Sequence, residues 1–310
     1  MGDSRRGRVS RELFLAAFGS NRPGFESWVT DRLVSLLQED ELRAGETLYS
    51  AGDTPEFVYF MREGTIQLVR EGLPKRTLEG LHVFGMGDGL LDRTRTRTAI
   101  AAIDLRLMKV RVDAWLELLD DSFELARASV LELARSIAHL EDRLDGPALS
   151  GGHASSWPEQ VPAGRLNVVE RLALLMEVPL LRGGGVQPLS DLAVASREIH
   201  FESGDELVER NARRERIFVV IEGQVDACRE QPPGLRTARA GEIVGGAAAF
   251  GQPALLWNAR ATRRGRALAF RVDDWFDLME EHFDLVRAAL AALSMQHENL
   301  LDKLGAEPSS

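Results

Sequence analysis

The sequence predicts an α+β protein, mainly β, made of two tandem copies of one unit. The first observation is an internal repeat, in which RVDAWLELLDDSFELARA (Arg111–Ala128) matches RVDDWFDLMEEHFDLVRA (Arg271–Ala288). The second is that 310 residues with 44% hydrophobic content can bury the cores of about two domains. The third is a stretch rich in Gly, Pro and Ser at residues 146–164, where hydrophobic periodicity stops. We therefore predict domains at residues 1–145 and 165–310, joined by the linker 146–164.

The elements of each copy follow from local patterns. Each copy begins with a helical stretch, continues through short runs rich in β-branched and aromatic residues, and ends in a long amphipathic helix. The runs in VYFMREGTIQLVRE (58–71) match those in IFVVIEGQVDACRE (217–230), and both read as strand pairs. Gly64 and Gly223 divide these pairs at tight turns, where glycine adopts a positive φ without steric cost.

Composition argues against several classes of protein. The net charge of −10 opposes the broad basic face that binds nucleic acid. Cys228 is the only cysteine, which excludes a disulfide within the chain, and we interpret it as a small buried hydrophobic residue in a strand. The sequence suggests neither a signal peptide nor a membrane span, so we predict a cytoplasmic protein with no membrane or nucleic-acid partner. Neither a catalytic constellation nor a spaced histidine cluster stands out, so we predict no enzyme activity and no metal.

One succession of motifs matches a known family. The succession begins with RAGETLYSAGDTPEFVYFMREGTIQLV. It continues with FG, a short predicted helix, an arginine, and TAIAAIDLRLMKVRVDAWLELL. This order resembles the cyclic-nucleotide-binding domains of catabolite activators and protein kinase A regulatory subunits, over residues 30–145 and more weakly over 180–304. The resemblance implies an eight-stranded β-roll (a double-stranded β-helix, or jelly roll) in each copy, closed by flanking helices, with the ligand inside.

The resemblance also implies a phosphate-binding cassette. In the family, a Gly after a strand precedes a Glu that holds the ribose hydroxyl, then a short helix with free N–H groups, and ten residues after the Gly an Arg pairs with the cyclic phosphate. Gly85 and Arg95 fit this spacing, but Met86 stands at the Glu position, and a thioether is a poor acceptor for ribose hydroxyls. The expected ligand is a cyclic nucleotide or another small anion. The candidate ligand-binding residues are Gly85, Met86, Gly87, Asp88, Gly89, Arg95 and Thr96.

Two alternatives stay open for these motifs. RTRTRT (93–98) also fits a solvated edge strand with arginines on one face and threonines on the other. In the second copy, Gly246 follows Gly245 at the Glu position and Leu255 stands at the Arg position, so both polar contacts are lost. We expect this second cassette to be structural only.

Apolar seams on the helices that end each copy suggest assembly. The positions recur at spacings of three and four and predict a homodimer through the terminal helices. The alternative is that each seam packs within its own chain. The sequence thus predicts a non-enzymatic sensor or adaptor whose output passes to an unidentified protein partner, the alternative being an assembly scaffold that binds no small molecule. The predicted interface residues are Val130, Leu133, Ile137, Leu140, Leu290, Leu293, His297 and Leu300.

Overall fold

The structure is a computed structural model that describes residues 27–143, 147–148, 157–158, 160–209, 215–230, 233–244 and 257–306. It divides into two compact units, residues 1–129 with 301–310, and residues 130–300. The predicted boundaries stay predictions, because much of the linker 146–164 lies outside the described residues. Within that range, β9 (Pro147–Ala148) pairs in parallel with β13 (Pro233–Ala238) of the second unit.

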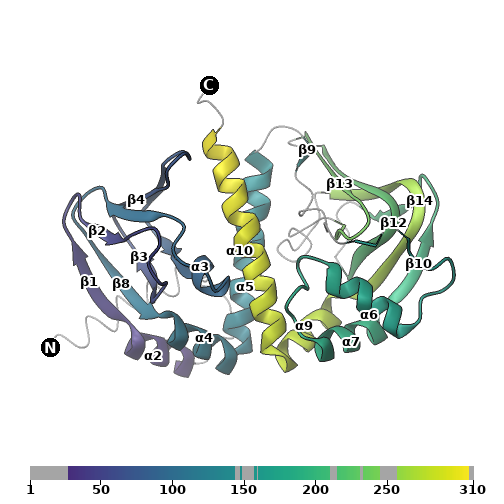
Figure 1. Cartoon of the computed structure of the whole chain (residues 1–310), viewed down its shortest axis with the longest axis horizontal. Coiled ribbons are helices and arrows are strands. Elements are labelled where there is room, and N and C mark those ends of the chain that lie inside the picture. The colour runs from purple at the N-terminus through teal and green to yellow at the C-terminus, as the bar shows by residue number, and fades with distance from the viewer. Residues whose placement is uncertain are drawn as a thin grey trace. The chain divides into compact units, whose positions relative to one another are not determined.

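The first unit is an eight-stranded roll, which confirms the predicted fold. Its antiparallel strands form two four-stranded sheets in the orders β1-β8-β3-β6 and β2-β7-β4-β5, and these sheets do not close into a barrel (Figure 1). The strands are β1 (Gln38–Leu42), β2 (Thr47–Tyr49), β3 (Phe57–Met61), β4 (Thr65–Val69), β5 (Arg76–Glu79), β6 (His82–Phe84), β7 (Thr98–Ala101) and β8 (Leu105–Arg111).

Strand β3 is apolar along its whole length because both of its faces are buried. Tyr59 and Met61 point into the roll, where they join an apolar cluster drawn from both sheets. Phe60 points the other way and meets the indole ring of Trp115 on α4 (Val112–Asp121) at a centroid distance of 5.6 Å. Helix α2 (Ser27–Leu36) lies beside α4, and α5 (Phe123–Arg143) follows α4 along the chain. The roll interior is therefore filled by side chains at the level of β3.

The second unit keeps the roll, and its described residues form fewer and longer strands than those of the first unit. The counterparts of β3 and β4 run on as the 15-residue strand β12 (Arg216–Glu230), and those of β7 and β8 as the 15-residue strand β14 (Trp257–Arg271). The other elements are α6 (Val168–Glu177), α7 (Val186–Ala195), β10 (Arg197–Phe201), β11 (Glu206–Val208), α9 (Val272–Glu281) and α10 (Phe283–Ala306), whose last six residues belong to the first unit.

Glycines let β12 and β14 bend together without breaking. Gly64 and Gly223 have the predicted positive φ, at 123° and 92°. A Cβ on Gly265 would lie 1.9 Å from the Glu222 carbonyl oxygen, so the two backbones approach more closely than any side chain allows. The pairing register shifts around Glu222, and the strands curve from one sheet layer to the other without a separate turn.

Two further observations concern predicted features. The interpretation of Cys228 as a buried residue is wrong, because it lies on β12 with its side chain exposed. Local desolvation and the nearby Asp226 carboxylate raise the pKa of its thiol, which disfavours the reactive thiolate. Within the described part of the chain, no helix is long and apolar enough to cross a membrane.

Candidate functional site

The predicted cassette begins at a glycine that the geometry requires. Gly85 follows β6 with φ 84° and precedes the short helix α3 (Met86–Leu90). A Cβ at this position would lie 3.0 Å from the Tyr59 ring and 3.3 Å from the Phe57 carbonyl oxygen. Gly89 is similarly crowded, 3.0 Å from the Val112 side chain. The glycines of the motif thus serve a close approach of α3 to β3 and α4.

Arg95 is buried and is held by the chain itself. Only 2% of the residue is exposed. Its guanidinium donates to the Gly85 carbonyl oxygen and, at 2.6 Å, to that of Phe57. The group also lies 4.4 Å from the ring centroid of Tyr49 and 5.9 Å from that of Tyr59. The arginine predicted to pair with a phosphate therefore acts as a pin between α3, β2 and β3.

Stacked aromatic rings fill the roll next to Arg95. Tyr59 stacks between Tyr49 and Phe84, with centroid distances of 5.6 and 5.3 Å. Burial raises the pKa of Tyr59, an effect opposed by the nearby Arg95 cation. Sequence reasoning missed this stack, because the tyrosines are 10 residues apart and only the pairing of strands brings them together.

Met86, at the position expected to contact ribose, has a different partner. Its sulfur accepts a hydrogen bond from the indole N–H of Trp115 at 3.1 Å. Trp115 is 1% exposed, so the Met86 sulfur gives its buried indole N–H a hydrogen-bond acceptor. The side chain thus joins α3 to α4.

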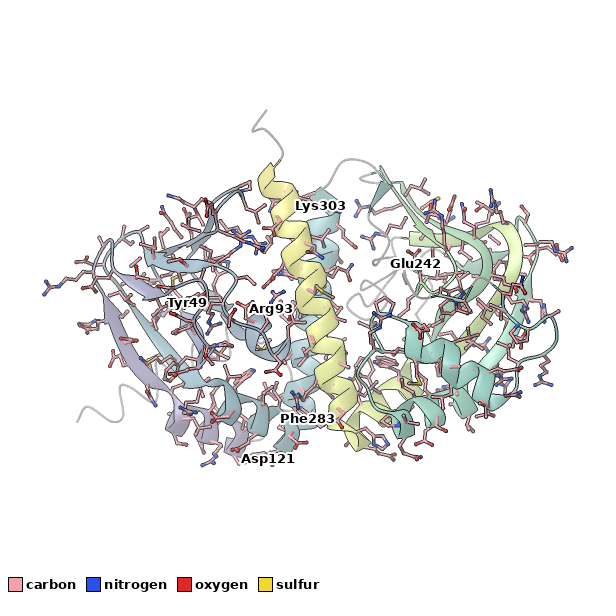
Figure 2. All side chains as sticks on the ribbon, viewed as in Figure 1. Tyr49, Arg93, Asp121, Glu242, Phe283 and Lys303 are labelled. Atoms are coloured by element: carbon pink, nitrogen blue, oxygen red, sulfur yellow. The ribbon has the colours of Figure 1, made fainter. Side chains whose placement is uncertain are left out.

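Asp88 accepts hydrogen bonds that a ligand would otherwise need. Its carboxylate accepts from Arg93 Nε at 2.8 Å, and from the Thr96 hydroxyl and backbone N–H at 3.3 and 3.4 Å. The residue is 8% exposed, which makes it one of the buried charged groups of the roll. Figure 2 labels Arg93, the ion-pair partner of Asp88. The sequence placed Asp88 near the cassette but gave no sign of its pairing with Arg93.

The alternative interpretation of RTRTRT as a solvated edge strand is wrong for Arg95 and Arg97, and residues 93–97 precede strand β7, which begins at Thr98. Arg95 and Arg97 are 2% and 6% exposed, whereas the alternating threonines are more accessible. Arg97 donates to Asp302, which also accepts from Arg76 Nε at 3.0 Å. Burial lowers the pKa of Arg97, and the neighbouring Arg76 cation adds to this effect. Two of the three arginines are therefore buried, while the Arg93 side chain is 33% exposed.

A cavity of about 420 Å³ opens beside Arg95. Its charged lining has three carboxylates and two cations, and the Lys109 ammonium pairs with Asp40 at 2.7 Å. The cavity therefore presents a net negative lining. The residues that line it are Asp40, Leu48, Tyr49, Asp53, Thr54, Glu56, Phe57, Tyr59, Arg95 and Lys109.

Comparison with known protein families agrees with this geometry. The family described as "Cyclic nucleotide-binding domain" matches residues 39–122 and again residues 198–282, which together make up more than half of the chain. The chain belongs to the cyclic nucleotide-binding domain family. The two matches coincide with the two copies of the repeat and confirm the resemblance seen in the sequence. The family is one of regulatory binding domains and not of catalytic ones.

Several solved structures are similar to this chain. A cAMP-bound PfPKA-R structure (141–441) has 14% identity and a TM-score of 0.37, with 98% of this chain and 92% of that chain covered. The regulatory domain of Toxoplasma gondii PKA with cAMP has 16% identity, a TM-score of 0.33, and coverages of 91% and 94%. The regulatory subunit of a cAMP-independent protein kinase A from Trypanosoma brucei has 14% identity, a TM-score of 0.36, and coverages of 98% and 90%.

The second cyclic nucleotide-binding domain is described only outside its cassette. Gly245, Gly246 and Leu255 lie outside the described residues, so the loss of that cassette stays a prediction. The strand that follows is described, and its Arg260 pairs with Glu206 as Ile100 pairs with Thr47 in the first domain. Arg260 therefore corresponds to Ile100 on β7 and not to Arg95 of the first cassette.

The predicted interface residues are largely buried within one chain. The exceptions are Leu133 and His297, which are partly exposed. The His297 ring nitrogen lies 2.9 Å from the Ser136 hydroxyl, and both residues belong to the second unit. The homodimer stays a prediction, but six of the eight seam residues from which it was argued are already buried in a single chain. The buried members are Val130, Ile137, Leu140, Leu290, Leu293 and Leu300.

Proposed function

We propose that this chain is a non-enzymatic regulatory adaptor that works without a cyclic nucleotide and acts through contacts with a protein partner. Of the two functions left open by the sequence, this is closer to the scaffold that binds no small molecule. The observation that carries the proposal is the state of Arg95. Its guanidinium donates to two backbone carbonyls and lies against the rings of Tyr49 and Tyr59. Pairing with a phosphate would require these contacts to break.

The ribose position supports the same proposal. Met86 replaces a charged acceptor and is engaged by Trp115. A lost hydrogen bond to a charged group costs about 1.5–3 kcal/mol, which corresponds to about tenfold to a hundredfold in affinity. Together with the engaged Arg95, this weakens both polar contacts on which cyclic-nucleotide recognition depends.

The cavity beside Arg95 is also poorly suited to an anion. Asp40, Asp53 and Glu56 outnumber the two cations in its lining. A cyclic nucleotide is a monoanion, and like charges within a few ångströms raise the free energy of the bound state. A neutral group meets no such penalty there.

Calorimetric titration of the full chain with cyclic AMP and cyclic GMP tests the proposal. We expect no heat of binding at millimolar ligand and no rise in melting temperature, because only a ligand bound to the folded state raises apparent stability. A dissociation constant below about 100 μM for either nucleotide would overturn the proposal. Stabilisation by a nucleoside or dinucleotide in the same screen would instead favour the sensor predicted from the sequence.

A further inference from the structure

Asp88 binds the groups that ordinarily hold a phosphate. Guanidinium, hydroxyl and backbone N–H are the donors by which proteins bind phosphate oxygens. In the first cassette one donor of each kind, from Arg93 and Thr96, points at the Asp88 carboxylate. The Arg93 contact is the short one at 2.8 Å, while both Thr96 contacts are long and correspondingly weak.

The chain path after α3 places the carboxylate among these donors. Asp92 has φ 48°, a left-handed conformation that turns the chain back. The Arg93 backbone N–H then donates to the Asp88 carbonyl oxygen at 3.1 Å, which brings the Arg93 side chain over the Asp88 carboxylate. In the Arg93–Asp88 ion pair the Arg93 side chain is 33% exposed and the Asp88 side chain is 11% exposed, so the carboxylate is largely shielded from water.

We infer that Asp88 is a built-in anion of the first cassette and the residue that excludes phosphate groups from it. A phosphate entering the cassette would compete with Asp88 for Thr96 and Arg93 and would lie next to a like charge. This inference rests on the proposed function and adds the residue responsible. It also defines the excluded class of ligand, namely inorganic phosphate and phosphate monoesters and diesters, including cyclic nucleotides.

The consequence is that removing one negative charge opens the cassette to phosphate. Asp88→Asn keeps the size of the side chain and frees the Arg93 guanidinium from its ion pair. Thr96 keeps both of its donors in this variant. The matched control is Asp92→Asn, which removes the same charge from an exposed residue of the same loop, where asparagine tolerates the left-handed backbone.

The experiment measures binding of inorganic phosphate to the full chain by calorimetry and by melting temperature, against sodium chloride of equal ionic strength. We expect Asp88→Asn to bind phosphate at least about tenfold more tightly than the wild type, since charge-assisted donors become available. Asp92→Asn should match the wild type. Adding Thr96→Val to Asp88→Asn should reduce the gain, because it removes the hydroxyl donor.

Each outcome decides between the inference and the proposed function. Phosphate and cyclic-nucleotide binding by the wild type would overturn both. If neither the wild type nor a folded Asp88→Asn variant binds phosphate, only the inference is overturned. An equal gain in Asp92→Asn would also overturn it, since the effect would then be general charge. Asp88→Ser provides a second neutral variant, and loss of folding in both would make Asp88 a structural anchor and end the inference.

Discussion

Arg95 illustrates how one residue can keep the place of a ligand contact and take on a structural role. Arg95→Lys should lower the free energy of unfolding by about 2–4 kcal/mol, because an ammonium cannot reproduce the forked contacts to two carbonyls. Urea denaturation measures the change. The control is Arg106→Lys, whose ion pair with Glu41 is 73% and 63% exposed and should change stability by less than about 0.5 kcal/mol. Equal effects in both variants would contradict the pinning role.

Tyr59 gives the roll a dependence on alkaline pH. Burial raises its pKa above the ordinary value of 10.0. A pKa raised on folding contributes stability that is fully present below the unfolded pKa and is lost as pH rises through the folded one. The free energy of unfolding should therefore fall above about pH 10, and more steeply in the wild type than in Tyr59→Phe. Parallel slopes in the two proteins, measured by denaturant titration, would contradict this assignment.

Residue spacing predicted which cassette positions matter but not what they contact. Gly85 and Arg95 stand out because their ten-residue separation matches the cassette of the family that the sequence resembles. The pairing of Met86 with Trp115 and of Asp88 with Arg93 depends on side-chain directions around α3, which are fixed by the left-handed turns at Gly85 and Asp92. No periodic pattern encodes those directions. Cys228 was misplaced because its alternation was overlooked, since it lies on the same face of β12 as Asp226, opposite the buried Val225 and Ala227.

At the level of elements, the strand runs were predictable and their continuity was not. The pattern marks β3 and β4 as two strands, yet their counterparts in the second unit are one strand, β12. The difference arises where Gly223 and Gly265 approach each other across β12 and β14, a contact between residues 42 positions apart. Gly64 and Gly223 stand at equivalent positions in the two copies, so the sequence alone does not show that one lies in a turn between two strands and the other lies within a single bent strand.

Gly265→Ala should therefore destabilise the second unit strongly. The new Cβ would lie 1.9 Å from the Glu222 carbonyl oxygen, so the backbones of β12 and β14 must separate. We expect a loss of about 3 kcal/mol or more, in the range of severe core substitutions. Gly164→Ala has no heavy atom within 4 Å of its new Cβ and should be close to neutral. Circular dichroism during thermal unfolding compares the two variants, and a neutral Gly265→Ala would mean that the strands do not approach this closely.

At the level of the whole molecule, the heptad-like seams predicted that the terminal helices need a partner but could not name it. Apolar spacing is the same whether the partner is a second chain or another part of the same one. Within the second unit, His297 contacts Ser136 and Gln296 donates to Glu141 at 3.1 Å, so α10 and the end of α5 are linked inside one chain. The buried Arg236–Glu141 ion pair, at 2.6 Å, ties β13 to the same helix.

Paired substitutions on α10 distinguish the two partners. Leu293 is 1% exposed and Met295 is 44% exposed, so the same charge can be placed on the covered and the open side of one helix. If the seam packs within the chain, Leu293→Glu buries an unpaired charge and should lower the free energy of unfolding by about 3 kcal/mol or more, while Met295→Glu stays near neutral. Light scattering should give the same mass for both variants as for the wild type. A wild-type dimer that becomes a folded monomer on Leu293→Glu would instead establish the homodimer, because a twofold interface places the introduced charge against its own copy.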